Sequence, residues 1–327
     1  MSVLLFVLGL LLAQPASPPD RHLDVLFWNV ENFFDFRNDS TSVSDAEFSS
    51  FGARRWTRKR FYAKCNAIAK TLLWIASEKG RMPDIVALAE VENAFVLRRL
   101  LQATALCKTD YRYVHFDSPD HRGIDVALLY RSKSLELTEA EPHRLYHPED
   151  STLLGTRDIL LCRFKTRPDG GEESDLAVLV NHRPSKFGGA AVSEPRRRIA
   201  VERLRQLTDS LSAAGIGAII ATGDFNDTPD NPVFRLLEER LIPLHNALFL
   251  KGEGTIKYNG RWDLIDQAYV SPSLLAPEGP SMEILRIPFL LTEDTVHFGE
   301  KPLRTYVGPR YTGGVSDHLP ILLHLVI

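Results

Sequence analysis

Four polar motifs of this chain lie directly beside apolar runs, and together they carry carboxylates, amides and an imidazole. The motifs are Trp28-Asn29-Val-Glu31, Ala-Leu-Ala-Glu90-Val, Gly-Asp224-Phe-Asn226 and Ser-Asp317-His318. Such groups at strand ends are what divalent-metal phosphoester chemistry requires. The metal supplies positive charge there, while the other groups position and activate a water.

Each motif also has a simpler interpretation. Asn29 fits a turn after a strand, and Glu90 fits a solvated strand end. Glu92 already offers a surface charge beside it, however, and a carboxylate that emerges from a buried strand needs a partner such as a hard cation. Asp224 and Asn226 are typical turn residues, but at i and i+2 their side chains can also point the same way and hold one water.

A histidine ends another apolar run, in the segment Asn181-His182-Arg183-Pro-Ser-Lys186. This segment leads into a helix expected from about Ser193. A helix N-terminus with a histidine, an arginine and a lysine nearby favours an anion. As a single histidine, His182 is better explained as a core or surface residue.

Two further acids, Asp263 and Asp266, lie inside an apolar strand, so alternation turns at least one of them inward, where it needs a proton donor. Asp317 and His318 are adjacent in sequence. They would face opposite sides of a strand but can converge in a loop, where one binds metal while the other meets phosphate.

The composition of the chain limits how it could bind nucleic acid. The net charge is −3 and the isoelectric point is about 6.4, so no global field holds polyanions, and nucleic-acid contact must come from local basic patches. Two basic clusters are candidates, although each is equally a solvated helix face. They are Arg54, Arg55, Arg58, Lys59, Arg60 and Lys64, and Arg183, Lys186, Arg196, Arg197 and Arg198. The three cysteines, odd in number and without metal-ligand spacing, indicate buried free thiols.

The N-terminus carries eleven consecutive apolar or glycine residues at 3–13. This run is shorter than the roughly 20 residues that span a bilayer and fits the apolar part of a secretory signal. A buried N-terminal strand is the alternative, since no lysine or arginine precedes the run. We expect residues 1–20 to be a signal peptide and short polar leader, and 21–327 to be one exported catalytic domain without a transmembrane span.

Short apolar strands alternate with two amphipathic helices in the rest of the sequence. The predicted strands are Leu23–Asn29, Ile85–Ala89, Ile124–Tyr130, Ile159–Phe164, Leu176–Asn181, Gly217–Thr222, Leu264–Val270 and Ile321–Ile327. The helices are expected at about Thr57–Lys79 and Ser193–Ala214, with Pro195 in the first turn of the second. Several strands alternate little, which indicates cover on both faces. The fold class is therefore α/β, a four-layer α-β-β-α sandwich with two packed, mainly antiparallel sheets.

In their order, these motifs resemble those of the endonuclease/exonuclease/phosphatase superfamily, from about Leu23 to the C-terminus. The matching segments are Trp-Asn-x-Glu, the strand-ending Glu, Asn-His-x-Pro-Ser, Gly-Asp-Phe-Asn, Leu-Ile-Asp-Gln and Ser-Asp-His. The segments Glu31–Asp35, Asp125–Tyr130 and Arg304–Arg310 are most similar to the bacterial exported endonuclease-type branch.

The resemblance implies a role for each motif. Glu90 would be the principal ligand of Mg²⁺, with Mn²⁺ as the alternative ion, and Asn29, Glu31 and Asp317 would contact the ion directly or through water. Asp224 and Asn226 would deprotonate and orient the attacking water. Asp266 would hold His318, which stabilises or protonates the phosphate, and His182 would contact the phosphate from the other side. His318 remains an alternative general base.

The expected function is a metal-dependent phosphodiester hydrolase, an endonuclease on DNA or RNA, with Arg183 and Lys186 contacting the substrate and no stable protein partner. The alternative is a phosphatase or phosphodiesterase acting on inositol phosphates or on lipid head groups, as sphingomyelinases do. The long polar segment 290–314 is either a lid over the site or a surface insertion.

Overall fold

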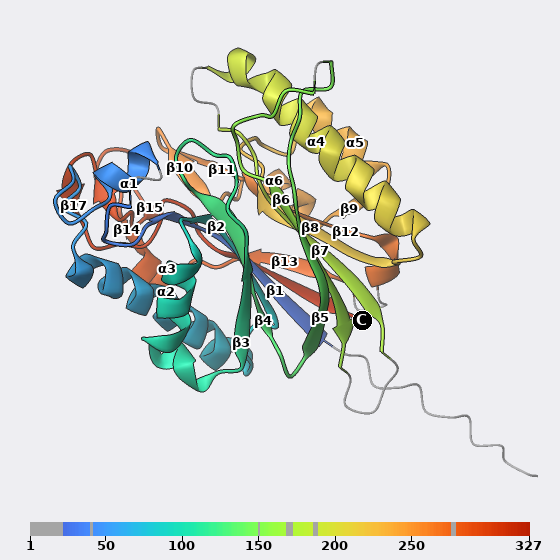
Figure 1. Cartoon of the computed structure of the whole chain (residues 1–327), viewed down its shortest axis with the longest axis horizontal. Helices are drawn as coiled ribbons and strands as arrows, with labels where there is room; N and C mark the ends of the chain where they lie inside the picture. The colour runs from blue at the N-terminus through green and yellow to red at the C-terminus, as the bar shows by residue number, and fades with distance from the viewer. Residues whose placement is uncertain (1–21, 40–41, 150, 168–172, 186–188, 276–278) are drawn as a thin grey trace, which may run out of the picture.

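The computed structural model describes residues 22–39, 42–149, 151–167, 173–185, 189–275 and 279–327, without the side chains of 190–192. The predicted leader and Lys186 lie outside these residues. Two six-stranded sheets pack face to face, with α2 and α3 on one outer side and α4 on the other (Figure 1). The predicted four-layer sandwich is confirmed.

The first sheet has the order β13-β18-β1-β2-β4-β3. Its strands are β13 (Ser281–Ile284), β18 (Ile321–Val326), β1 (His22–Phe33), β2 (Ile85–Val91), β4 (Asp125–Arg131) and β3 (Tyr111–His115). Only β1 and β2 run parallel, and every other neighbouring pair is antiparallel.

The second sheet has the order β5-β6-β7-β8-β12-β9 and repeats this arrangement. Its strands are β5 (Leu135–His143), β6 (Ile159–Thr166), β7 (Asp175–His182), β8 (Ala218–Asp224), β12 (Asp266–Val270) and β9 (Ile242–Pro243). Here β7 and β8 form the parallel pair, at the centre of the sheet.

Three apolar clusters separate the four layers. Val25 and Phe27 of β1 face the core between the sheets, whereas Leu26 and Trp28 face the cluster under α2 and α3. Alternate residues of a strand point to opposite faces, so a strand buried on both faces is apolar throughout. A third cluster, including Leu204 of α4, covers the second sheet.

The two long helices differ in how well the sequence predicted them. Helix α2 (Arg58–Lys79) begins after Thr57, whose side chain accepts a hydrogen bond from the amide of Arg60, and ends at Gly80 in the left-handed conformation. Helix α4 (Ala190–Ala213) begins three residues before the expected start, so Pro195 lies inside the helix instead of in its first turn. That part of the prediction is wrong.

Shorter elements complete the fold. They are α1 (Val43–Glu47), α3 (Ala94–Gln102), α5 (Arg235–Glu238), α6 (Asn246–Leu250), the 3-10 turns η1 (Ala105–Lys108), η2 (Pro232–Phe234), η3 (Pro272–Leu274) and η4 (Pro288–Leu290), and the hairpins β10–β11 (Ile256–Tyr258, Arg261–Asp263), β14–β15 (Leu291–Glu293, Glu300–Pro302) and β16–β17 (Tyr306–Val307, Arg310–Tyr311). All eight predicted strands are present, although β12 starts two residues late. In the two six-stranded sheets, β3, β5, β9 and β13 were not predicted, and neither were the strands of the three hairpins. Strand β5 carries three glutamates, as suits an edge strand.

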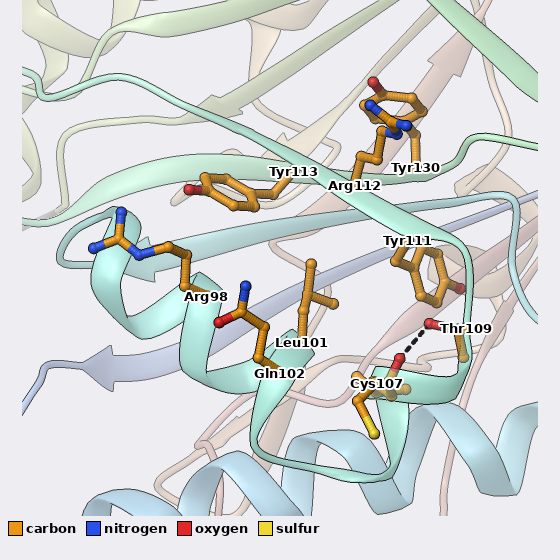
Figure 2. A pocket seen from close by; sticks show the side chains of 10 residues that line it. Arg98, Leu101, Gln102, Cys107, Thr109, Tyr111, Arg112, Tyr113 and Tyr130 are labelled. Carbon is orange, nitrogen blue, oxygen red and sulfur yellow. Dashed lines mark hydrogen bonds between the residues drawn. The ribbon is translucent and has the colours of Figure 1, made fainter.

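No cysteine is paired. Cys65 and Cys162 are buried free thiols, as expected, but Cys107 is exposed. Figure 2 shows Cys107 with Arg98, Leu101 and Tyr113 on a cavity of about 640 Å³ between α3, η1 and β3. None of the predicted site residues lines this cavity. Within the described residues, no helix has the length and apolar character needed to cross a bilayer.

Candidate active site

The predicted residues meet because of strand direction. Asn29, Glu90, His182 and Asp224 lie at or near the carboxyl ends of β1, β2, β7 and β8, which are the two parallel pairs. Parallel strands place their carboxyl ends at the same sheet edge. Strands β12 and β18 run antiparallel to these pairs, so their amino ends bring Asp266 and the 316–318 segment to that edge.

Asp224 joins the two sheets. Its Oδ2 accepts a hydrogen bond of 3.1 Å from the side-chain amide of Asn29, and its Oδ1 accepts one of 2.8 Å from the backbone amide of Asn226. Nε2 of His182 lies 3.5 Å from the same Oδ2, and Nε2 of His318 lies 3.9 Å from it. Burial raises the pKa of Asp224, although the His318 imidazole opposes this shift.

His318 and Asp266 form a buried pair. Nδ1 of His318 lies 2.8 Å from Oδ2 of Asp266, so Nε2 is left to face Asp224. Burial by itself lowers the pKa of His318, but the carboxylates of Asp266 and Asp224 outweigh burial and raise this pKa well above its usual range. Asp266 therefore orients the His318 imidazole and favours its protonated form.

Two hydrogen bonds hold the segment before β18 against β1, and a third stabilises the turn within the segment. The hydroxyl of Ser316 donates to the carbonyl of Asn29 over 2.6 Å and accepts from the amide of His318 over 3.0 Å. The indole of Trp28 donates to the carbonyl of His318 over 2.9 Å. The Trp-Asn and Ser-Asp-His motifs therefore position each other.

His182 is buried and neutral. Burial lowers its pKa well below the usual value, and the positive charges of Arg157 and Arg122 lower it further. Arg157 donates to Asp120 over 2.9 Å and to the carbonyl of Arg183 over 2.6 Å. The basic character of this side of the site therefore comes from Arg122 and Arg157.

Glu31 and Asp317 share one arginine. Nε and Nη2 of Arg304 lie 3.0 and 2.9 Å from Oε1 of Glu31, and the same Nη2 lies 2.9 Å from Oδ2 of Asp317. The amide of Thr305 donates to the second Glu31 oxygen, and buried Lys64 donates to the Glu31 carbonyl and to the Thr305 hydroxyl. Burial and the Asp317 carboxylate raise the pKa of Glu31.

These contacts also show where part of the 290–314 segment lies. Its residues Arg304 and Thr305 bind Glu31, and with Arg54 and Tyr306 they line a cavity of about 140 Å³ beside that carboxylate. The segment forms two hairpins, β14–β15 and β16–β17. Residues 304–306 are thus a wall of the site.

Glu90 lies beside Asn32 and Arg122. Its Oε2 accepts a hydrogen bond of 2.7 Å from the amide of Asn32, and Nη2 of Arg122 lies 3.4 Å from the carboxylate. Glu31, Asn32, Glu90 and Asn226 all have positive φ, between 45° and 63°. Non-glycine residues rarely adopt this conformation, and such residues concentrate at functional sites, where surrounding contacts hold them.

Gly223 explains the glycine in the Gly-Asp-Phe-Asn motif. A Cβ built at Gly223 would lie 2.0 Å from the carbonyl oxygen of Asn181 on the neighbouring strand. A larger residue would force β7 and β8 apart at the point where they present His182 and Asp224. Glycine is therefore required for the close approach of these two strands.

Arg183 does not join the site. It is buried, its guanidinium lies 4.0 Å from the centre of the Phe225 ring, and none of its three side-chain nitrogens has a hydrogen-bond partner among the described residues. Burial lowers its pKa to about 9. Since successive residues point to opposite faces, the turn that aims His182 at Asp224 aims Arg183 at the α4 layer. This placement does not fit a substrate contact.

A sequence model of the endonuclease/exonuclease/phosphatase family matches residues 24–326. The chain belongs to the endonuclease/exonuclease/phosphatase family. Members of this family are phosphoesterases, so the chain is a phosphoester hydrolase by family. The sequence has no match among curated proteins.

Several solved structures share the fold of this chain, although their sequence identity to it is low. A family protein from Bacteroides thetaiotaomicron is 17% identical with a TM-score of 0.55, over 94% of this chain and 98% of that one. A mannosyl-6-phosphatase from the same organism is 15% identical with a TM-score of 0.55, over 93% and 100%. The human Nocturnin catalytic domain with bound sulfate is 17% identical with a TM-score of 0.54, over 94% and 98%.

Enzymes of this family depend on metal, and two groups of residues at this site could hold a metal ion. Glu31 and Asp317 converge on a single nitrogen of Arg304, the side-chain oxygen of Asn29 accepts a hydrogen bond from the Glu31 amide, and the Glu90 charge also acts on Arg304, so a hard cation fits an all-oxygen set there. Ligand atoms of Asp224, Asp266 and His318 also lie within 4.8 Å of one another. In the second group, the carboxylates of Asp266 and Asp224 raise the pKa of His318 and keep its imidazole protonated, so this ring offers no lone pair to an ion and the first group fits a metal better.

Several residues of this family site were not predicted. They are Lys64, which the sequence offered only as one member of a basic cluster, and Asp120, Arg122, Arg157, Arg304 and Thr305. Arg304 and Thr305 lie in a segment that supported the resemblance to the superfamily. Site residues were predicted at the ends of apolar strands, however, and no predicted strand ends beside these two residues. The others lie in a helix or in loops, where no local pattern separates a site residue from a solvated charge.

Proposed function

We propose that this chain is a metal-dependent phosphodiester hydrolase that acts as an endonuclease on DNA or RNA. The observation that carries the proposal is the position of the Asp224 carboxylate. Its Oδ2 has the Asn29 amide, the neutral His182 and the charged His318 within 3.9 Å. A candidate base, Asp224, thus lies beside a neutral imidazole, His182, and a cationic imidazole, His318, at the junction of the two sheets.

Asp224 is the candidate base for the attacking water. Its raised pKa makes it a better proton acceptor than an ordinary aspartate, and Asn226 and Asn29 fix its two oxygens. The water oxygen forms a bond to phosphorus while its proton passes to Asp224. The bond from phosphorus to the leaving oxygen breaks at the same time.

His318 is the candidate donor to the phosphate. Its raised pKa keeps it protonated, so it cannot first accept a proton, and this favours Asp224 over His318 as the base. The imidazolium stabilises the developing negative charge, or passes its proton to the leaving oxygen. Asp266 orients the ring through Nδ1.

Mg²⁺ is the expected metal, with Mn²⁺ as a substitute, held by Glu90, Glu31, Asp317 and Asn29. A bound hard cation would neutralise phosphate charge and polarise the phosphorus–oxygen bonds. Among the chain's own residues, neutral His182 would add a hydrogen-bond donor without charge, while Arg122 and Arg157 supply positive potential nearby. Arg304 must rearrange when the cation binds, since it occupies both carboxylates.

The cavity beside Glu31 supports a polymeric substrate. Arg54 and Arg304 line this cavity and offer positive charge beside Glu31, whereas Phe48 and Tyr306 are buried in its wall. Cationic contacts with the phosphate backbone supply most of the sequence-independent affinity of proteins for nucleic acid. A structural neighbour, the D. rerio TDP2 in complex with a single-stranded DNA product, has a TM-score of 0.53 and 14% identity over 94% of this chain and 99% of that one.

The proposal is tested with a substrate panel. Plasmid DNA, single-stranded DNA, structured RNA, a sugar phosphate, an inositol phosphate and sphingomyelin are each incubated with Mg²⁺, Mn²⁺ or Ca²⁺, and with EDTA. We expect nicking of plasmid or cleavage of RNA that EDTA abolishes and Asp224→Asn removes. Glu239→Gln, an exposed acid paired with Arg205, is the matched control. Turnover of the small phosphates or of sphingomyelin alone would instead support the phosphatase or lipid phosphodiesterase function.

Export is a separate proposal that rests on the apolar run at residues 3–13. It predicts that the chain, expressed in bacteria from its first residue, is recovered outside the cytoplasm with a shortened N-terminus. N-terminal sequencing of the recovered protein tests this. Recovery in the cytoplasm with an intact N-terminus would contradict it.

A further inference from the structure

A buried carboxylate away from the proposed active centre has no hydrogen-bond partner. Asp158, just before β6, is 5% exposed, and neither of its side-chain oxygens accepts a hydrogen bond among the described residues. The nearest cationic group is Nε of Arg144, at 3.8 Å, on a half-exposed side chain. Burying a carboxylate without a partner is costly, so this side chain needs an explanation.

A second carboxylate shares the space. Asp158 and Asp125 of β4 both line a cavity of about 10 Å³, together with Ser118 and the apolar residues Phe116, Val126, Pro142 and Leu160. This volume accommodates a single water or ion. Strands β4 and β6 belong to the two facing sheets (Figure 1), so the cavity lies at the seam between them.

Asp125 is held in place from its other side. Its Oδ1 accepts hydrogen bonds from the amide and the hydroxyl of Ser118, and its Oδ2 lies 3.1 Å from Nε2 of His115. A carboxylate has about four lone-pair sites, so one remains on Oδ2. Asp117 is exposed, and ligand atoms of Asp117, His115 and Asp125 lie within 4.8 Å of one another. The Asp117 carboxylate therefore attracts cations from solvent toward Asp125.

The two carboxylates repel each other. Burial raises the pKa of Asp158 to about 6, Arg144 opposes this, and the Asp125 charge adds to it. Above that pH, both groups are negative at the wall of one small cavity. A cation resolves the repulsion and supplies the partner that the Asp158 oxygens lack.

We propose that Asp158, Asp125 and Ser118 bind one divalent cation through oxygen ligands, at a site separate from the catalytic centre. Asp158 supplies two free oxygens, Asp125 its remaining lone pair, and Ser118 its hydroxyl oxygen. Ca²⁺ is the class of ion that fits, because it accepts irregular oxygen shells that include bidentate carboxylates. The neighbouring imidazole of His115 supports Asp125 from outside the cavity.

The site has a structural consequence for the active centre. The loop between Phe116 and Ile124 carries Asp120, which binds Arg157, and Arg122, which contacts Glu90. Ser118 and Asp125 lie at the two ends of that loop, and Asp158 is adjacent to Arg157. A cation at the seam would therefore fix both arginines beside His182 without touching substrate.

The test uses the full chain with Glu90→Gln and Asp317→Asn as the parent, so that the catalytic acids do not compete for metal. At pH 7.5, we expect calorimetry to show one equivalent of Ca²⁺ bound to this parent and the Tm to rise with Ca²⁺. Adding Asp158→Asn should abolish both effects, whereas adding Glu136→Gln, an exposed acid paired with Arg167, should change neither. Ser118→Ala leaves both acids in place and should weaken Ca²⁺ binding by about tenfold.

In EDTA the order of stabilities should reverse. Asp158→Asn should then have a Tm equal to or above that of its parent, because a neutral amide replaces an unpaired buried charge. Equal Ca²⁺ stoichiometry with and without Asp158→Asn would overturn the proposal. So would a parent that binds no Ca²⁺ and loses stability as pH rises through 6 whether or not Ca²⁺ is present, since Asp158 would then simply be protonated. No arm of the test measures hydrolysis, so its failure is distinct from failure of the proposed function.

Discussion

Arg304 donates two hydrogen bonds to one oxygen of Glu31, at 3.0 and 2.9 Å, and its Nη2 is equally close to Asp317. Two predicted metal ligands therefore share the single positive charge of a side chain that is about half exposed. Arg304 is in a position to compete with the metal for these oxygens.

We expect Arg304→Met to bind Mn²⁺ more tightly, by about three- to tenfold, because removing a guanidinium from two carboxylates leaves their charge to the ion. Calorimetric titration of the metal measures this. Arg304→Lys keeps the charge without the planar fork and should lie between the two. A weaker Mn²⁺ affinity in Arg304→Met would mean that the arginine organises the ligands instead of competing for them.

Asp224→Asn and His318→Ala should each lower kcat by about 10² or more, because each removes a group placed to act on the transition state. The measurement is steady-state nicking of plasmid DNA in Mg²⁺, with folding checked by circular dichroism. Near-wild-type turnover in either variant would contradict the assigned site.

Arg183→Met should leave KM for DNA within about twofold of wild type, and the free energy of unfolding unchanged or raised, since replacing a buried charged group by an apolar one of similar volume is often neutral or stabilising. The reason is its placement between Phe225 and Phe234, away from Asp224. Urea unfolding and substrate kinetics check the two parts. A large rise in KM would restore the substrate contact that the sequence indicated.

His324 predicts a pH dependence of stability away from the site. Hydrogen bonds to Asp24 and Glu283, each 2.8 Å, raise its pKa to about 9, and burial only partly opposes them. A raised folded-state pKa means that the contribution is complete below the unfolded pKa of about 6.5 and is lost as pH rises through 9. Urea unfolding at pH 6 and 9.5 should show this loss in wild type and a smaller one in His324→Gln. Equal losses would show that His324 is not its source.

Local sequence was enough to predict the sandwich and most of the residues that meet at the edge of its two sheets. Strands such as β1 and β2 are apolar on both faces. This pattern indicates a sheet that other layers cover on both sides. Polar residues stand near the carboxyl ends of these strands and of β8, among them Asn29, Glu90 and Asp224. Their order along the chain matched the family, and the parallel pairs then brought them to one edge.

Only the tertiary structure decided which charges face each other. Arg183 and His182 are neighbours in sequence, yet they point into different layers because alternation reverses the side chain at each residue. Arg304 reaches Glu31 across 273 positions, and the carboxylates of Asp158 and Asp125 meet only where the two sheets pack. Contacts between the two sheets produce no periodic pattern in the sequence. The sequence therefore identifies the charged side chains, but only the packing of the sheets determines which of them pair with each other.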